Sequence, residues 1–338
     1  MKNNHVNIPV FIPHLGCPNM CVFCNQRAIS GVSSFIPDMA EEVIETVLSS
    51  LHDKEQSTEI AFFGGSFTGI DRKLMISLLD LAESYVDDGR VSGIRMSTRP
   101  DYIDEEIIGI LKNYTVKAVE LGIQSTSDKV LKASKRGHIS SQSRKAMEML
   151  SDAGLKTVGQ MMIGLPLAEP QDEIKTAEDI CDFGAVGARI YPTIVFRDTE
   201  LCDMTQRGEY TPLSVDDAVK RSADVLEVFD KHNVECIRIG LCDSENLHSD
   251  KTYYAGPNHP ALGEMIISEV FYKNICRAVT EGSRNRSITI YAPIGSVSAV
   301  AGHKKCNKLR LASEYGIENV KIIEDATLIG HNIRVEEN

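Results

Sequence analysis

The sequence predicts an α/β protein: a partial or full (β/α) barrel followed by a small α/β appendage. Short apolar runs recur along the first 241 residues, and most are followed by a turn and an amphipathic helical pattern. Repeated strand–helix units build a parallel sheet with right-handed crossovers, which closes naturally into a barrel, with a doubly wound open sheet as the alternative. The 338 residues, of which 42% are hydrophobic and 25% charged, exclude a disordered or fibrous chain.

We expect seven strands, each a short apolar run bounded by turn residues. They are residues 8–12, 59–63, 93–97, 118–123, 157–163, 188–195 and 235–239. Amphipathic helices are expected between them at residues 39–51, 72–86, 107–113, 142–153 and 218–232. In either sheet architecture ligands bind at the carboxyl ends of the strands, so chemistry is expected in the residues just after each strand.

The strand–helix pattern changes after residue 241, so we expect a barrel domain over residues 1–241 and an appendage over residues 242–338. The appendage should contain a helix over 259–276, a strand over 287–293 and a short strand–helix–strand tail. Its basic cluster, residues 303–310, fits a solvated helix face better than a contact with RNA.

The charge balance and the cysteine pattern indicate the cellular compartment in which we expect the protein. The chain carries 36 Lys+Arg against 48 Asp+Glu, a net charge of −12, so no overall field attracts it to nucleic acid or to an anionic membrane. No stretch has the length of an apolar membrane span, and the first residues lack the apolar core of a signal peptide. The nine cysteines are odd in number and mostly scattered, as in a reducing compartment. We expect a cytoplasmic protein without membrane contact.

Three cysteines, Cys17, Cys21 and Cys24, form a C-x3-C-x2-C loop directly after the first expected strand. Structural zinc sites usually have four protein ligands, so zinc would also require a residue such as His14. A [4Fe-4S] cluster held by three cysteines instead leaves one iron open to a further ligand. The loop therefore predicts an iron–sulfur cluster, with zinc as the alternative.

This loop, with the aromatic Phe23 just before its last cysteine, resembles the cluster-binding loop of radical S-adenosylmethionine (SAM) enzymes. The resemblance implies that Cys17, Cys21 and Cys24 bind a [4Fe-4S] cluster whose fourth iron is chelated by the methionine moiety of SAM. It further implies reductive cleavage of SAM to methionine and a 5′-deoxyadenosyl radical. An external electron donor of the flavodoxin or ferredoxin type is then expected as a partner.

The second strand runs into Gly64, Gly65 and Ser66. A glycine turn alone has little specificity, but after the cysteine loop it resembles the family's GGE-type motif, whose backbone binds the SAM amino group. This chain has Ser66 where Glu is commonest, so the resemblance implies a backbone role only.

The third and fourth strands also end in polar residues that resemble family motifs. Arg99 lies in a T-R-P turn and could pair with a carboxylate, or it could be a surface arginine before a proline turn. Gln124 and Ser125 belong to a G-[IV]-Q-S element, and the resemblance implies that both lie near the ribose and methionyl part of SAM.

Residues further along the chain also resemble motifs of the same family. Arg136 lies in an R-G-H element, which implies a partner for the SAM carboxylate, whereas the alternative is a helix cap. Gln160 and Met162 precede a G-L-P turn and would face the adenosine, although methionine in an apolar run is ordinarily core. Tyr191 follows on the sixth strand and could contact cofactor or substrate.

The resemblance covers about residues 6–241 and is to the branch that contains the elongator catalytic subunit and the oxygen-independent coproporphyrinogen oxidases. The spacing between the first two cysteines is shorter here than in the elongator subunit. The printed sequence also shows no glycine-rich acetyl-CoA loop, so acetyl transfer is not expected.

The sequence therefore predicts a radical SAM enzyme whose substrate, an RNA or a small metabolite, is not identified. Tyr191, Arg197 and Arg238 are candidates to line the substrate side, although Arg238 could equally be a buried ion-pair partner. An iron–sulfur protein for electron transfer or sensing is the first alternative function. A zinc-stabilised binding domain is the second.

Overall fold

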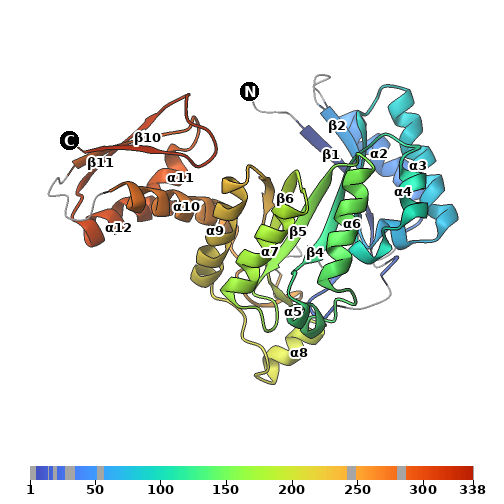
Figure 1. Cartoon of the computed structure of the whole chain (residues 1–338), viewed down its shortest axis with the longest axis horizontal. Helices are drawn as coiled ribbons and strands as arrows, with labels where there is room; N and C mark the ends of the chain where they lie inside the picture. Colours follow the sequence, from blue (N-terminus) through green and yellow to red (C-terminus); the bar gives the residue numbers. More distant parts are fainter. Residues whose placement is uncertain are drawn as a thin grey trace.

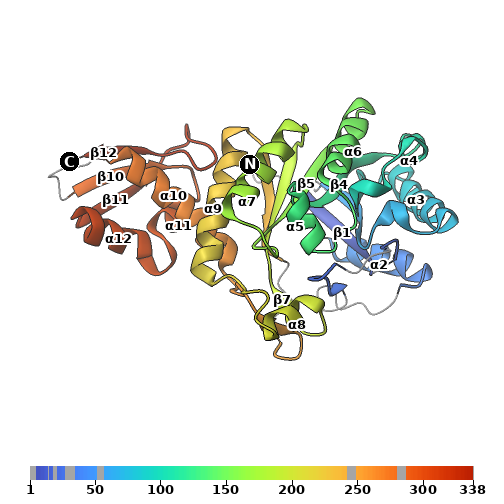
Figure 2. The same ribbon diagram turned by 60° about the horizontal axis from the view of Figure 1, so that its bottom comes forward.

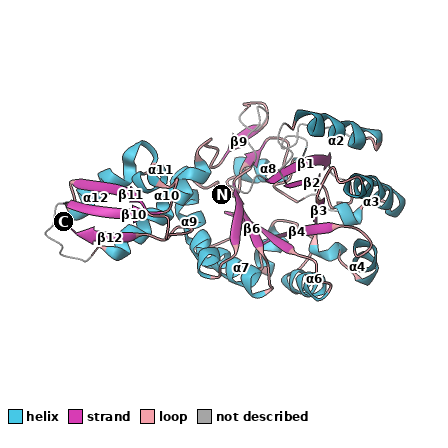
Figure 3. Ribbon diagram, turned by 90° about the horizontal axis from the view of Figure 1, so that it is seen from above, coloured by secondary structure: helices cyan, strands magenta, loops and turns pink. Residues whose placement is uncertain are grey.

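The computed structural model describes residues 5–13, 15–17, 21–26, 35–51, 57–241, 249–279 and 287–337. Its largest unit is a seven-stranded, all-parallel sheet in the order β1-β2-β3-β4-β5-β6-β8. The strands are β1 (His5–Ile12), β2 (Ser57–Gly64), β3 (Gly93–Thr98), β4 (Val116–Gln124), β5 (Thr157–Ile163), β6 (Gly187–Pro192) and β8 (Glu235–Ile239). The sheet curls without closing, so the expected barrel is a partial one, and this confirms the predicted fold class (Figure 3).

Helices cover the convex face of the curled sheet, as the view from above shows (Figure 3). The five expected helices are present as α2 (Asp38–Ser50), α3 (Arg72–Asp87), α4 (Glu105–Leu111), α6 (Ser140–Asp152) and α9 (Val215–Lys231). Three more had not been predicted: α5 (Asp128–Ala133), α7 (Pro170–Asp182) and α8 (Glu200–Gln206). Side-chain caps fix several starts, since Asp71 accepts from the Leu74 amide at 3.1 Å and Ser214 from the Asp217 amide at 3.1 Å.

The predicted strand over residues 188–195 was wrong at its end. β6 stops at Pro192, and Val195–Phe196 forms a separate strand, β7, which pairs antiparallel with β9 (Tyr253–Ala255). Proline has no amide hydrogen to donate, so it cannot continue the ladder of a central strand. The chain leaves the sheet there and builds a small ribbon beside α8 (Figure 2).

Alternation along the strands separates the core from the interior of the half-barrel. In β4, Val119, Leu121 and Ile123 are fully buried in the main hydrophobic core under the helices. The residues between them, Glu120 and Gly122, face the concave side. The concave side is therefore free to carry polar chemistry.

A C-terminal module lies beside α9 on one side of the half-barrel (Figures 1 and 2). Its sheet has the order β11-β10-β12, with β10–β11 parallel and β10–β12 antiparallel. The module contains α10 (Leu262–Ala278), β10 (Ser287–Ala292), α11 (Val297–Ala301), α12 (Cys306–Tyr315), β11 (Asn319–Glu324) and β12 (Arg334–Glu337). The first half of α10 packs in the main core and its second half packs in the module's own core, so one helix joins the two.

The basic cluster at residues 303–310 is partly used inside the module. Lys308 donates to the Val320 carbonyl at 2.8 Å, and Arg310 pairs with Glu269 and lies over the Tyr272 ring. No helix in the described part of the chain is both long enough and apolar enough to span a membrane.

Candidate active site

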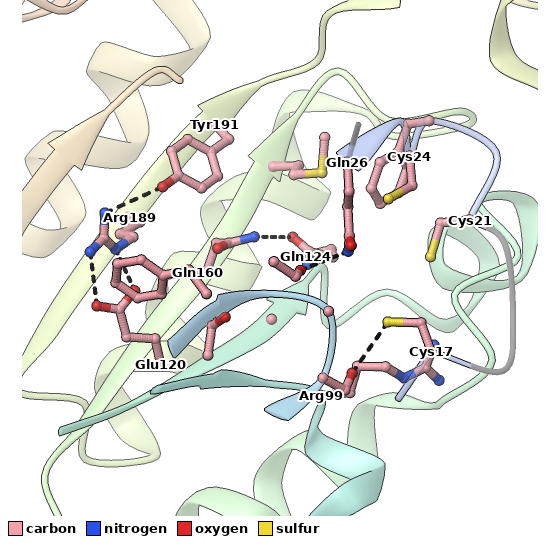
Figure 4. Close-up of a pocket in the computed structure, with 18 of the residues that line it drawn as sticks. Cys17, Cys21, Cys24, Gln26, Arg99, Glu120, Gln124, Gln160, Arg189 and Tyr191 are labelled. Atoms are coloured by element: carbon pink, nitrogen blue, oxygen red, sulfur yellow. Dashed lines mark hydrogen bonds and ion pairs between the residues drawn. The ribbon is translucent and has the colours of Figure 1, made fainter. Parts of the chain in front are cut away.

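A cavity of about 290 Å³ lies inside the half-barrel, between the cysteine loop and the concave face of the sheet (Figure 4). The structure brings together at this cavity most of the residues that the sequence singled out. Those that line it are Cys17, Cys21, Cys24, Gly64, Gly65, Ser66, Arg99, Gln124, Arg136, Gln160, Met162 and Tyr191.

Ser125, Arg197 and Arg238 are not among the lining residues, and Arg197 donates its Nε to the Asp250 carbonyl at 2.9 Å. The Ser125 hydroxyl accepts from the Ser127 amide at 3.1 Å on the helix side of the sheet, next to Thr176 of α7. The Arg238 guanidinium donates to the carbonyl oxygens of Gly240 and Leu241, each at 3.2 Å, and so fixes the turn after β8. The Ser125 contacts are made on the side of the sheet away from the cavity, whereas Arg238 holds the backbone of Leu241, which lines the cavity.

Backbone bonds hold the cysteine loop from two sides. The Val22 amide donates to the Ser134 carbonyl after α5 at 3.2 Å. The Leu201 amide of α8 donates to the Val22 carbonyl at 2.8 Å, and the Val22 side chain packs with Leu201 and Val195. The three thiols are thus carried by a loop that the short helices α5 and α8 position.

The cysteine thiols surround the cavity end rather than converging on one point (Figure 4). Among the described residues, no three His, Cys, Asp or Glu side chains are placed to share a single metal ion, and His14 lies outside those residues. An iron–sulfur cube takes each cysteine on a different iron, so separated thiolates suit it better than they suit one zinc ion. Burial, and then Cys21 and Cys17, raise the pKa of Cys24 to about 12, so its thiolate needs a bound cation.

Two arginines at this end of the cavity each hold one buried nitrogen without a partner among the described residues. Arg99 is 2% exposed and donates two hydrogen bonds to the Asp101 carboxylate, from Nε at 2.9 Å and from Nη2 at 2.8 Å. Its Nη1 has no hydrogen-bond partner in the described structure. Arg136 donates to the Gly122 carbonyl at 2.6 Å and lies 3.5 Å from the Cys21 sulfur, while its Nε is unpartnered among the described residues. Buried donors of this kind call for an acceptor, and an anionic cluster or a carboxylate supplies one. The donor set therefore fits a [4Fe-4S] cluster with SAM.

The glycine turn after β2 lies in backbone contact with the cysteine loop. The Gly65 amide donates to the Ile12 carbonyl at 2.8 Å, and the Ser66 amide donates to the Leu15 carbonyl at 3.1 Å. A Cβ atom on Gly65 would lie 2.0 Å from the Leu15 carbonyl oxygen, and one on Gly16 would lie 2.2 Å from the Ser66 carbonyl oxygen. Only glycine allows these two segments to approach so closely.

Gly65→Ala should therefore push the turn and the cysteine loop apart. We expect a loss of about 1–3 kcal/mol in the free energy of unfolding, because rigid backbone atoms must move to accept the methyl group, together with lower iron incorporation. Gly109→Ala is the matched control: no atom lies near its Cβ position in α4, so it should stabilise by about 0.5–1 kcal/mol. Urea unfolding and iron analysis measure both, and equal behaviour of the two variants would contradict this account.

A charged layer that the sequence did not predict lies at the other end of the cavity. Glu120, 3% exposed, is contacted by Arg189 Nε at 2.7 Å and Nη2 at 2.8 Å, and by Arg95 Nη1 at 3.2 Å. Arg189 Nη1 also donates to the Tyr191 hydroxyl at 3.4 Å. Burial disfavours the Arg189 charge, but Tyr191 and Glu120 outweigh burial and raise its pKa. Between this layer and the cysteines, Gln160 donates to Gln124 at 3.3 Å.

A parallel half-barrel with a three-cysteine loop at its carboxyl edge defines a class of metallocofactor enzymes. The sequence pattern of the Radical SAM superfamily matches residues 11–180, and that of the Radical_SAM C-terminal domain matches residues 185–271. The chain belongs to the radical SAM superfamily, whose members use a [4Fe-4S] cluster and SAM.

Relatives agree with the predicted branch. MJ0486 of Methanocaldococcus jannaschii is 28% identical over 238 residues, 67% of this chain and 72% of that protein. The tRNA uridine(34) acetyltransferase of Methanocaldococcus infernus is 35% identical over 134 residues, but these are 39% of this chain and only 25% of that protein. The structure of Methanocaldococcus infernus Elp3 without its N-terminus has a TM-score of 0.64 at 22% identity, covering 81% of this chain and 64% of that chain, and it supports the fold.

Proposed function

We propose that the protein is a radical SAM enzyme that holds a [4Fe-4S] cluster on Cys17, Cys21 and Cys24 and binds SAM in the adjoining cavity. The supporting observation is that the three cysteines, the glycine turn, Arg99 and Arg136 line one cavity. The cluster, when bound, would supply the electron for reductive cleavage of SAM to methionine and a 5′-deoxyadenosyl radical, which is the species that would act on a substrate.

The chain's own residues then bind and orient. The Gly64–Gly65 backbone would hold the SAM amino group, and Arg136 its carboxylate. Gln124, Gln160 and Met162 would lie along the adenosine. The aromatic side chains of Phe11, Phe23 and Phe63 line the same cavity and exclude water from the radical.

The substrate belongs to one of two classes, RNA or small metabolites. The relatives named tRNA uridine(34) acetyltransferase favour RNA, although the chain spans only about a quarter of their length. The net charge of −12 favours a small metabolite. The same proposal includes an external flavodoxin- or ferredoxin-type donor, a cytoplasmic location, and a barrel domain over residues 1–241 with a module over 242–338.

Anaerobic reconstitution with iron and sulfide tests the function. We expect a cluster whose EPR signal after dithionite reduction shifts on addition of SAM, with accumulation of 5′-deoxyadenosine. A cluster that neither binds nor cleaves SAM would overturn the proposal in favour of electron transfer or sensing. One equivalent of zinc without iron after anaerobic purification would overturn it in favour of a zinc-stabilised domain.

A further inference from the structure

At the end opposite the cysteines the cavity is lined by Glu120 and Arg189, and ion pairs connect them to Arg95 and Glu59, which do not line it; we call these four residues the charged floor. Figure 4 shows Arg189, Glu120 and Tyr191 together at that end, with Gln124 and Gln160 between them and the cysteine loop. Arg95 joins the two carboxylates, since its Nε lies 2.9 Å from Glu59 and its Nη1 lies 3.2 Å from Glu120. The layer is supplied by three neighbouring strands, β2, β3 and β4, and by β6, which lies one strand beyond β5.

The charged floor is electrically balanced. Two guanidinium groups face two carboxylates, and Arg189 donates its Nη2 to Glu120 at 2.8 Å, while its Nε lies 2.7 Å from Glu120 without the geometry of a hydrogen bond. Its Nη1 is left beside the Tyr191 hydroxyl at 3.4 Å, at the cavity surface. The floor therefore offers a hydrogen-bond donor edge without a net positive charge.

We infer that the charged floor is the substrate subsite, an inference that rests on the proposed function. The subsite would bind an uncharged carbonyl group, whose oxygen accepts hydrogen bonds from Arg189 Nη1 and from the Tyr191 hydroxyl. A carboxylate or phosphate buried here would lack a counter-charge, because Glu120 already neutralises Arg189. A carbonyl oxygen accepts the same two hydrogen bonds without that cost. The Phe11 and Phe63 rings, 6.5 Å apart, supply apolar wall for the rest of the molecule. Glu120 is then a positioning residue that both orients Arg189 and sets the charge preference.

Three small probes of similar size test this inference: acetamide, acetate and inorganic phosphate. Crystals of the reconstituted, SAM-loaded protein are soaked with each at one concentration, and ligand-observed NMR titrations give the relative affinities. We expect acetamide within hydrogen-bond distance of Arg189 and Tyr191, bound at least about tenfold tighter than either anion. Anion binding there, SAM occupying the floor itself, or no probe bound would each overturn the inference.

The Glu120→Gln variant tests whether the charge balance of the floor sets the preference for an uncharged ligand. Removing one carboxylate leaves the floor with a net positive charge, so the preference should reverse toward acetate and phosphate by about tenfold. Glu45→Gln is the matched control, because Glu45 is likewise held bidentately by Arg90, both bonds at 2.7 Å, but on the outer surface. It should leave the preference unchanged, and unreversed selectivity in Glu120→Gln contradicts the inference.

Tyr191→Phe provides a second test that does not remove a buried charge, in case Glu120→Gln fails to fold. It removes only the hydroxyl, so acetamide should bind several-fold more weakly while acetate and phosphate change little; unchanged acetamide binding would contradict the inference. SAM cleavage without any probe is measured in parallel on the unmodified protein. Absent cleavage with acetamide still on the floor counts against the proposed function alone, whereas intact cleavage with an empty floor counts against the subsite alone.

Discussion

Cys17→Ala should abolish iron–sulfur absorbance and SAM cleavage together. Cys17 lines the cavity, and its sulfur lies 3.4 Å from the Ser66 hydroxyl in the glycine turn. With only three protein thiolates for the cluster, loss of one leaves a second iron without a protein ligand. Reconstituted iron content, visible absorbance and chromatographic 5′-deoxyadenosine measure the effect, and we expect all three to fall to background.

Cys181→Ala is the control for this experiment. Cys181 is also partly buried, but it lies in α7 and packs against the outer side of the main core, away from the cavity. It should keep iron content and SAM cleavage near those of the unmodified chain. Retention of both by Cys17→Ala would refute the cluster assignment, and retention of iron alone would separate cluster binding from SAM chemistry.

The sequence was informative wherever a site residue follows a strand directly. Parallel strands present their carboxyl ends at one edge, so Cys17, Gly65 and Arg99 could be assigned to one cavity without knowledge of any long-range contact. The half-barrel itself followed from strand–helix alternation. Its incomplete closure was not decided, because hydrophobic periodicity does not report which end strands pair.

The misses have a common cause, which is the face on which a side chain lies. Neighbouring residues within a strand point to opposite faces, but Ser125 lies beyond the end of β4, where Gln124 has a φ of 67°, so alternation could not predict that Ser125 lies beside Thr176 of α7. The same rule applied backward from Tyr191 and Gly122 identifies Arg189 and Glu120 as facing inward. Their pairing across β4 and β6, however, skips β5 and depends on sheet curvature, which no local pattern encodes.

The buried ion pair between Glu173 and Arg221 should make a large contribution to the free energy of unfolding. Glu173 of α7 is 2% exposed and accepts from the Gly164 amide at 2.6 Å and from Arg221 of α9 at 2.6 and 2.8 Å. It thereby ties two helices to the turn after β5, the strand that carries Gln160 and Met162 into the cavity. Removing the arginine leaves an uncompensated buried carboxylate, which costs about 3–5 kcal/mol.

Arg221→Met should therefore lower the free energy of unfolding by about 3–5 kcal/mol at pH 7, whereas Arg90→Met, which breaks the exposed pair with Glu45, should change it little.

Burial already raises the pKa of Glu173 despite Arg221, so the folded chain holds this proton more tightly than the unfolded chain. Stability from this group is present below the unfolded-state pKa and is lost as pH rises through the raised folded-state pKa. The deficit of Arg221→Met should accordingly be smaller at pH 4.5 than at pH 7 in urea titrations, because a protonated Glu173 needs no counter-charge. A deficit independent of pH would mean that lost packing of the arginine stem, and not the buried charge, causes the effect.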